Sequence, residues 1–260
     1  MNSFLDLKRE GAVALITMNR PETRNAISDD DAVQAVVEMC ETLNHDTSIR
    51  AAILTGSGSS FSSGGNLKTL RDKMGGGLGE PIRSRQAYRD GIQRVPLALG
   101  SLEVPIIAAV NGPALGAGND LACLCDIRIA SERAVFAATF VKLGLIPGDG
   151  GAWLLPRVVG MSRACELAFT GDTIDARQAL QWGLVSQVVP ADDLLATATE
   201  LAQRIARNSG HALRMTKRLL RESTHSRMDT ILEMSAGFQA LAHHTAEHEA
   251  ALDAFLERRS

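Results

Sequence analysis

The stretch at residues 104–130, VPIIAAVNGPALGAGNDLACLCDIRIA, decides the fold that the sequence predicts. Its residues 106–110 form an apolar run that is long enough for a buried strand and too short for a buried helix. An Asn-Gly-Pro break follows, then two glycines flanking Ala117, then a helix-compatible run at 120–125. This order presents free backbone N–H groups and the positive end of a helix dipole to a ligand. With the carboxylate of Asp120 beside them, we expect half of an oxyanion site and an acid/base group here.

A second stretch repeats the same layout. Residues 51–55 predict another buried strand, and GSGSSFSSGGNLK follows it at 56–68. Two turns of this kind can direct two backbone N–H groups at one oxygen, and such preoriented donors stabilise negative charge that develops there. The alternative is that the glycines of both stretches only make tight turns.

The composition is that of a globular protein with one large domain, or one domain and a helical extension: 260 residues, 45% apolar and 22% charged. A net charge of −3 gives no basic field for nucleic acid or an anionic membrane surface. We also expect no membrane partner, because no apolar run approaches the roughly 20 residues of a spanning helix. The four cysteines lack disulfide or zinc-ribbon spacing and predict buried thiols in a reducing cytoplasm: Cys40, Cys123, Cys125 and Cys165.

Strands and helices are expected to alternate over most of the chain. Apolar runs predict strands at 4–6, 13–18, 51–55, 106–110, 126–130 and 184–188. Helical spacing predicts helices after an N-cap at Ser28, over 83–99, over 162–169, and between a cap at Asp175 and Gly183. From Asp192 onward we expect only amphipathic helices.

Motifs spread along nearly the whole chain carry a family resemblance. They are NRP and NA at 19–21 and 25–26, FSSGGNLK at 61–68, AVNGPALGAG at 109–118, CDI at 125–127, GLIPG at 144–148 and WGLV at 182–185. Together and in this order they resemble the crotonase superfamily, the enoyl-CoA hydratase/isomerase enzymes. The resemblance implies an α/β fold, a spiral of repeated ββα units over 1–195 that holds an acyl-CoA site, and C-terminal oligomerisation helices over 196–260. It further implies an acyl-CoA thioester substrate, no metal or redox cofactor, and a homotrimer or homohexamer.

The resemblance also assigns residues by position. The two oxyanion N–H donors of the family fall on Gly65 and Ala117. Contacts to coenzyme A and the acyl chain fall, by the same resemblance, on five further positions: Arg24, Ala26, Lys68, Phe140 and Arg258. For Lys68 and Arg258 the alternative is an ordinary solvated surface charge.

One departure from the family pattern concerns the catalytic acids. Typical hydratases of the family carry glutamates at the positions of Asp120 and Phe140. A phenylalanine cannot hold or deliver a proton, so two-glutamate activation of water is not available in its usual form. Asp149 offers a replacement, although it lies one residue beyond the position where some isomerase and dehalogenase relatives carry an aspartate. An apolar surrounding of Phe140 and Trp153 is expected to raise the pKa of a carboxyl group between them.

Structural alternatives remain for each acidic residue. Asp149 can instead cap the helix that follows Gly150, Asp120 can be a first-turn charge on its own helix, and Asp126 is expected to be a local cap or a buried turn. The H-x-x-E-H sequence at 244–248 matches an inverted zinc-peptidase pattern, but no third acidic ligand accompanies it, and no metal site is predicted.

The leading functional hypothesis is double-bond isomerisation or hydration of an enoyl-CoA. Asp120, with Asp149, moves protons around an enolate that Gly65 and Ala117 hold. One alternative is hydrolysis or substitution at an acyl-CoA with Asp149 as nucleophile, as in dehalogenase-like relatives. The other is a non-catalytic member that binds acyl-CoA.

Overall fold

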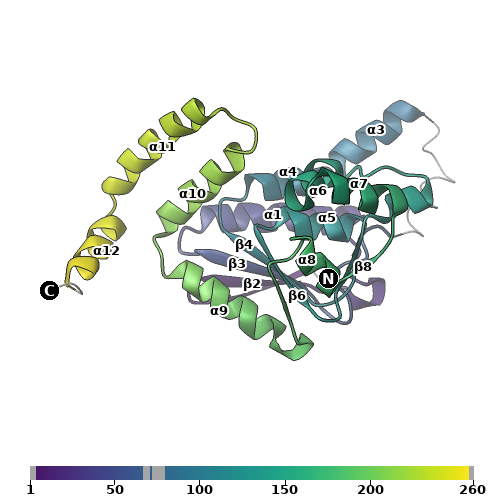
Figure 1. The fold of residues 1–260 in the computed structure, drawn as a ribbon, viewed down its shortest axis with the longest axis horizontal. Coiled ribbons are helices and arrows are strands. Elements are labelled where there is room, and N and C mark those ends of the chain that lie inside the picture. The colour runs from purple at the N-terminus through teal and green to yellow at the C-terminus, as the bar shows by residue number, and fades with distance from the viewer. Residues whose placement is uncertain (1–3, 67–70, 72–79, 258–260) are drawn as a thin grey trace.

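A parallel sheet forms the centre of the protein, whose computed structural model describes residues 4–66, 71 and 80–257 (Figure 1). Its strand order is β1-β2-β3-β4-β6-β9, and every neighbouring pair except β1 and β2 is parallel. The bounds are β1 Leu5–Glu10, β2 Val13–Met18, β3 Ala51–Gly56, β4 Ile106–Val110, β6 Ile127–Ser131 and β9 Gln187–Val189. A smaller sheet has the order β5-β7-β8, with β5 Ala114–Leu115, β7 Val135–Ala137 and β8 Ile174–Asp175.

Helices cover both faces of the large sheet. The first four long helices are α1 Asp30–His45, α3 Pro81–Asp90, α4 Arg94–Ser101 and α5 Ala117–Leu124. They are followed by α6 Gly151–Val159, α7 Met161–Thr170, α8 Ala176–Gln181 and α9 Leu194–Ala206. Short 3-10 helices lie at Pro21–Thr23, Thr139–Leu143 and Ala191–Asp193. Because both faces are covered, the central strands are continuous apolar runs.

Alternate residues of the strands feed two cores. In β3, Ala52 and Leu54 pack into the larger core with α1, α4 and α5. Ala51 and Ile53 point the other way and pack against Ala198 of α9. The mixed α/β fold expected from the sequence is confirmed.

Several predicted boundaries differ from the structure for local reasons. The N-cap of α1 is Asp29, which accepts from the Ala32 N–H at 2.9 Å, and not Ser28, whose hydroxyl accepts from the Asn66 N–H. The single helix expected over 83–99 is two helices, because the backbone leaves helical geometry at Gly91. The predicted cap at Asp175 is confirmed by a 2.7 Å hydrogen bond from the Gln178 N–H.

Two other boundaries are shifted along the chain. Helix α5 begins at Ala117, three residues before the expected start, so its first N–H groups belong to the glycine turn itself. The strand expected over 184–188 begins only at Gln187, because residues 182–184 still close the turn after α8.

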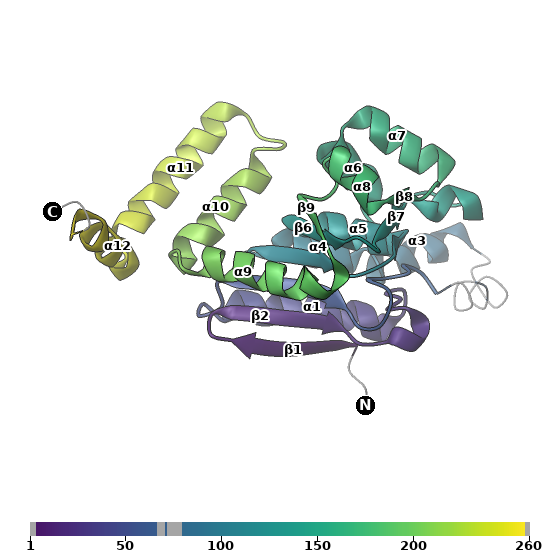
Figure 2. The same ribbon diagram turned by 60° about the horizontal axis from the view of Figure 1, so that its bottom comes forward.

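The C-terminal helices extend away from the sheet (Figures 1 and 2). They are α10 Gly210–Glu222, α11 Met228–His243 and α12 Ala246–Glu257. The boundary predicted at residue 196 falls inside α9, and α9 packs on the sheet with Leu194, Ala198 and Ala202 buried. Helices α11 and α12 contain no buried residue. The helical part that stands outside the core therefore begins with α10.

Asp126 attaches α10 to the core. Its carboxylate accepts from the Ile106 N–H at 2.8 Å and pairs with Lys217 at 2.7 Å and Arg221 at 3.0 Å. Lys217 is buried and also donates to the Val104 carbonyl. The prediction of a structural role for Asp126 is confirmed, although its partners lie on a distant helix.

Two further sequence predictions can be compared with the described residues. Cys40, Cys123 and Cys125 are free and buried, and Cys165 is free and half-buried. Within 4–66, 71 and 80–257, the helices are all too short or too polar to cross a membrane.

Candidate active site

The two glycine turns lie side by side. Ser62 donates its N–H to the Pro113 carbonyl at 3.1 Å, and Leu115 donates to the Ser62 carbonyl at 3.0 Å. A Cβ at Gly118 would lie 2.2 Å from the Ser62 carbonyl oxygen, and one at Gly64 would lie 2.9 Å from the Ala117 nitrogen. Glycine at these positions is therefore what allows the two turns to approach so closely.

The N–H groups of Gly65 and Ala117, at this junction, have no acceptor in the described part of the chain. Ala117 is the first residue of α5, so its N–H has no partner within the helix. The space where a Cβ of Gly65 would lie is open to at least 4 Å. Both predicted donors are thus brought to one junction and are free to bind a ligand oxygen.

The segment at residues 23–27 is fixed against the Gly64 turn. Ile27 donates its N–H to the Gly64 carbonyl at 2.9 Å, and the Ser63 N–H donates to the Arg24 carbonyl at 2.8 Å. Ala26 is buried in this segment, whereas the side chain of Arg24 is exposed and has no ion pair among the described residues. The structure therefore places both predicted contact residues beside the junction. Lys68 and Arg258 lie outside the described residues.

Asn25 shapes this segment. Its backbone is left-handed, with a φ of 55°, a conformation that asparagine tolerates better than most residues. Its buried amide donates to the carbonyls of Ser57 and Ser60 and accepts from the Arg20 N–H. Asn25 is a structural residue of the site.

Asp120 is the central acidic group. Its side chain is only 1% exposed, and its Oδ2 accepts from the Gly151 N–H at 3.1 Å. Its Oδ1 is buried without a hydrogen-bond partner in the described structure. A Cβ at Gly151 would lie 2.5 Å from Oδ1 and 2.6 Å from Oδ2. The first N–H of α6 therefore holds a carboxylate that comes from α5, and only a glycine leaves room for it.

The surroundings of Asp120 change its titration. Burial raises its pKa to about 7, and repulsion from Asp149 adds to the rise. The Gly151 N–H and the nearby Asn119 amide oppose it, although the amide is not aligned for a hydrogen bond. Burial also raises the pKa of Asp149 to about 6. Both carboxyl groups therefore have pKa values in the range where a carboxyl group can give and take protons near neutral pH.

The capping alternative for Asp149 is wrong. The N-cap of α6 is Gly150, with a φ of 107°, and no side chain caps this helix from that position. The carboxylate of Asp120, from another helix, accepts from the Gly151 N–H, the first of α6. Asp149 is partly buried, and its carboxyl group makes no hydrogen bond or ion pair within the described residues.

Only one of the two expected apolar neighbours lies at the site. The ring of Phe140 is 3.8 Å from the point where a Cβ of Gly116 would lie, so it packs beside the oxyanion turn. Trp153 is 51% exposed and stacks under the guanidinium of Arg157 at 4.0 Å. The prediction that Trp153 makes the site apolar is therefore wrong, because its position on α6 faces solvent.

Two polar residues of the site were missed from the sequence. Asn119 is 1% exposed, and both atoms of its amide lack a hydrogen-bond partner in the described structure. Tyr88, the only tyrosine of the chain, has its pKa raised by partial burial and by the charge of Asp149. A polar residue next to a candidate acid in an otherwise apolar helix start could have drawn attention to Asn119. No local signal marked Tyr88, which reaches the site across the fold.

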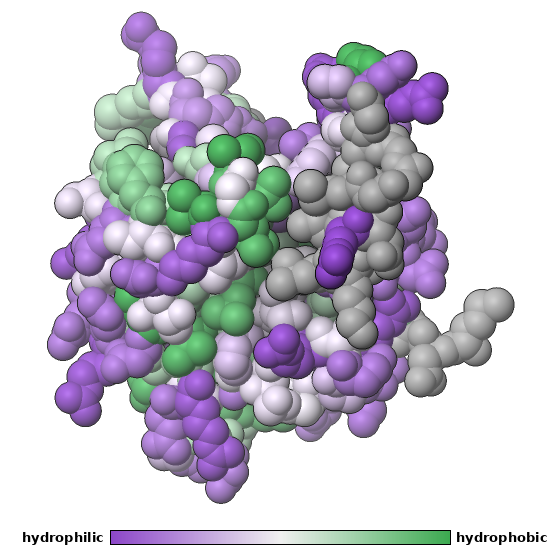
Figure 3. Space-filling view, turned by 90° about the vertical axis from the view of Figure 1, so that its right-hand side faces the viewer, coloured by the Kyte–Doolittle hydropathy of each residue, from purple (hydrophilic) through white to green (hydrophobic). Residues whose placement is uncertain are grey.

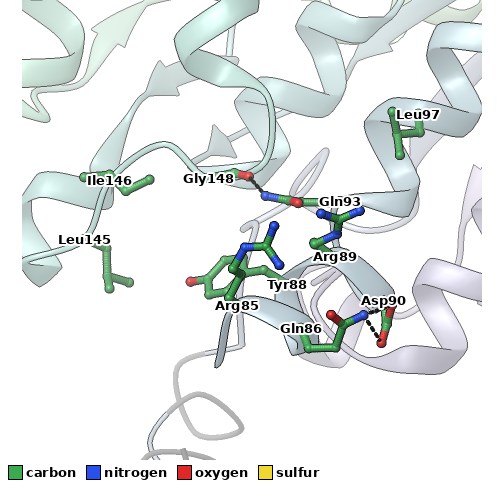
Figure 4. Close-up of a pocket in the computed structure, with 10 residues that line it drawn as sticks. All are labelled: Arg85, Gln86, Tyr88, Arg89, Asp90, Gln93, Leu97, Leu145, Ile146 and Gly148. Carbon is green, nitrogen blue, oxygen red and sulfur yellow. Dashed lines mark hydrogen bonds between the residues drawn. The ribbon is translucent and has the colours of Figure 1, made fainter. Parts of the chain in front are cut away.

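A cavity of about 720 Å³ lies beside Asp149, between α3 and the loop at 145–148 (Figure 4). Tyr88 and Gln93 line it from one side and Gly148 from the other, and Gln93 donates to the Gly148 carbonyl at 3.1 Å. The surface on the α3 side of the molecule carries a band of hydrophobic residues among hydrophilic ones (Figure 3). A partly apolar ligand can therefore lie next to the carboxyl pair.

No group of three or more potential metal ligands forms in the described part of the chain. In the H-x-x-E-H segment, Glu247 pairs with Arg50 at 2.6 Å and accepts from the Ser209 hydroxyl, which ties α12 to the core. His243 and His248 lie 3.2 Å apart through their ring nitrogens. The glutamate of the motif thus has a structural partner.

A model of the enoyl-CoA hydratase/isomerase family matches residues 8–260. The chain belongs to this family. Members similar to it include a 1,2-epoxyphenylacetyl-CoA isomerase of Escherichia coli K12, which is 37% identical over 100% of this chain and 98% of that protein. A 2,3-dehydroadipyl-CoA hydratase of the same organism is 37% identical over 99% of this chain and 97% of its own. This enoyl-CoA hydratase/isomerase family member is therefore an enzyme, as its sequence predicts.

A solved structure of the family agrees with the fold. The crystal structure of an enoyl-CoA hydratase from Bacillus anthracis matches with a TM-score of 0.90 and 33% identity, over 98% of this chain and 96% of that one. The crotonase-like α/β architecture expected from the sequence is confirmed.

Proposed function

We propose that this enzyme isomerises or hydrates an enoyl-CoA through an enolate, with Asp120 and Asp149 as the acid/base pair. The observation that carries the proposal is the buried Asp120 carboxyl group, which has one oxygen without a partner and lies three residues from the free N–H of Ala117. A buried carboxyl group without a cation costs folding free energy when it is ionised. Its presence beside the junction of the two glycine turns therefore favours a role in proton transfer.

The oxyanion donors are the N–H groups of Gly65 and Ala117. When a proton leaves the carbon next to a thioester, or a nucleophile adds to its conjugated alkene, negative charge moves to the carbonyl oxygen. Two N–H groups at one junction, one of them at the start of α5, stabilise that charge. One such donor contributes about 3 kcal/mol.

The two aspartates divide the proton transfers. In isomerisation, the ionised member removes a proton from the carbon chain and the protonated member returns one at the other end of the allylic system. In hydration, the ionised member takes a proton from the attacking water and the protonated member delivers one to the α-carbon. A pair that holds one proton near neutral pH can serve either reaction. Phe140 occupies the second-glutamate position and supplies only an apolar wall.

The coenzyme A moiety is assigned to the residues beside the junction. Ala26 and Arg24 lie in the segment held against the Gly64 turn, and the guanidinium of Arg24, which has no ion pair among the residues that the structure describes, suits a phosphate. Lys68 and Arg258 stay predictions for the phosphate end of coenzyme A.

A homotrimer or homohexamer is part of the proposal. Helices α11 and α12 carry exposed apolar side chains, among them Leu232, Leu241, Leu252 and Leu256, each about half exposed or more. A second copy of the chain would remove this surface from water. Light scattering tests the assembly, and a monomer at micromolar concentration would contradict it.

A panel of enoyl-CoA thioesters tests the function. Wild type is expected to convert a 2-enoyl-CoA or 3-enoyl-CoA, and mass spectrometry in deuterated water separates hydration from isomerisation. Asp120→Asn and Asp149→Asn should each lower kcat strongly. If Asp149→Asn keeps full activity, the aspartate pair is wrong, and if wild type only binds CoA esters, the protein is not an enzyme of this reaction. A covalent acyl adduct on Asp149 would instead establish nucleophilic catalysis.

A further inference from the structure

The cavity between α3 and the 145–148 loop borders the candidate active site at Gly148, the residue next to Asp149. A Cβ at Gly148 would lie 3.4 Å from the ring of Tyr88, so α3 and the 145–148 loop are in contact there. Gly148 directly precedes Asp149, and the charge of Asp149 acts on Tyr88. An acyl chain that leaves the aspartate pair can therefore enter this cavity.

Two arginines line the cavity from α3. Arg85 and Arg89 are one helical turn apart, so they lie on the same face of the helix. Figure 4 shows both guanidinium groups on the cavity side of α3. Neither has a carboxylate partner within the described residues, whereas Arg83 of the same helix pairs with Glu80 at 3.4 Å.

Among the described residues that line the cavity, the one carboxylate, Asp90, has a different partner. Both oxygens of Asp90 accept from the Gln86 amide, at 2.8 and 2.9 Å, and this pair lies away from the two guanidinium groups (Figure 4). The positive charge of Arg85 and Arg89 therefore exceeds the negative charge of the cavity lining by one unit, and it is not neutralised locally.

Three further lining residues are apolar. Leu97, Leu145 and Ile146 contribute hydrocarbon surface, and Leu97 and Ile146 are more than 70% exposed. Large exposed apolar side chains next to guanidinium groups that have no carboxylate partner in the described part of the chain suit a ligand with methylene groups and a terminal anion. Arginine is the side chain best matched to a carboxylate, which it can bind through two parallel hydrogen bonds.

We propose that Arg85 and Arg89 bind a carboxylate at the distal end of the acyl chain, which makes ω-carboxyl acyl-CoA thioesters the substrate class. This inference rests on the proposed function, because that function places the acyl chain at the aspartate pair. The phosphates of coenzyme A present the same anion chemistry, and the experiment separates the two sources.

Isothermal titration calorimetry with saturated thioesters measures binding without turnover. Adipyl-CoA is compared with hexanoyl-CoA, suberyl-CoA with octanoyl-CoA, and free coenzyme A serves as the phosphate-only probe. Wild type should bind the carboxylated member of at least one pair about tenfold or more tightly, the effect expected for a charge-assisted hydrogen bond. In the double variant R85Q/R89Q the ratio should fall to about one. Arg83→Gln, on the same helix, should keep the wild-type ratio.

Two results would overturn the inference. One is a wild-type ratio near one for both chain lengths. The other is equal weakening of adipyl-CoA, hexanoyl-CoA and free coenzyme A in R85Q/R89Q, which would assign the arginines to the coenzyme A phosphates. The binding test is independent of the turnover test of the proposed function. A preference for the carboxylated thioesters that depends on both arginines supports this subsite even where no enoyl-CoA is converted.

Discussion

Asp120 and Asp126 lie near opposite ends of α5, and their surroundings differ. Asp126 is a quarter exposed and contacts two cations, Lys217 and Arg221, in addition to a backbone N–H. Asp120 is almost completely buried, contacts one backbone N–H, and has another carboxyl group as its electrostatic neighbour.

The difference distinguishes a carboxylate that stabilises the fold, Asp126, from a carboxyl group that is suited to proton transfer, Asp120. A carboxylate that pairs with two cations and a backbone N–H contributes to the stability of the fold, and removal of one partner of such a pair is destabilising. A buried carboxyl group beside a second one costs free energy when it ionises, and its pKa moves into the range where it can both give and take a proton. The same substitution at the two positions should therefore have opposite effects.

The largest effect is expected for Asp120→Asn on activity. The amide keeps the size of the side chain and can still accept from the Gly151 N–H, but it cannot carry the proton. We expect kcat to fall on the order of 10³-fold, within the range for removal of a general acid or base. At pH 8 the free energy of unfolding should not decrease, because a buried negative charge is removed. A loss of both activity and stability would assign Asp120 a structural role.

Asp126→Asn should produce the reverse result. The substitution leaves Lys217 buried with only the Val104 carbonyl, so the free energy of unfolding should fall by about 3 kcal/mol, the lower end for a broken buried ion pair. Urea unfolding measures this change. The activity per folded enzyme should stay within about threefold of wild type, since Asp126 faces α10 and not the glycine turns. If activity falls as far as in Asp120→Asn, the contrast between the two aspartates is wrong.

Gly151→Ala should lower activity by displacing the Asp120 carboxyl group from the α6 side. The new methyl group would lie within 2.6 Å of both oxygens of Asp120, so the carboxyl group must move. A displacement of about 1 Å can cost on the order of 10²-fold in rate, and we expect a loss of that size in kcat. Gly100→Ala is the matched control, because Gly100 is also helical and its added Cβ meets nothing within 4 Å. Equal losses in the two variants would exclude the steric explanation.

Much of the fold could be predicted from local pattern. The strand at Ile106–Val110 was predicted residue for residue, because an apolar run bounded by proline and an Asn-Gly turn allows few alternatives. The division between α3 and α4 could not be predicted, since Gly91 and Pro96 are compatible with a continuous helical pattern until the fold sets the backbone at Gly91. The helix boundary at Ala117 was missed because alanine and glycine carry no capping signal.

The site depends more on contacts between distant segments. The sequence predicted that two turns converge, yet it could not show that Asp120 holds the first N–H of α6, because that contact joins residues 31 positions apart. For the same reason Asp149 was open to interpretation as a cap. Arg85, Tyr88 and Arg89 carry no motif, and only the packing of α3 against the 145–148 loop brings them to the cavity.

The smallest effect is expected in the pH dependence of stability, which tests the comparison directly. The folded protein raises the pKa of Asp120 to about 7 and that of Asp149 to about 6, above the ordinary value of 3.8 for each. The folded state therefore binds more protons than the unfolded state between these values, and the free energy of unfolding should fall as the pH rises from about 4 to about 7. Urea unfolding at pH 5 and pH 8 should show a larger fall for wild type than for Asp120→Asn at the same protein concentration. The same pair should give kcat/KM a maximum between pH 6 and 7, where one proton is bound, and Asp149→Asn should remove one limb of that profile. An unchanged difference between pH 5 and pH 8 in Asp120→Asn would mean that Asp120 is ionised throughout, like a paired structural carboxylate.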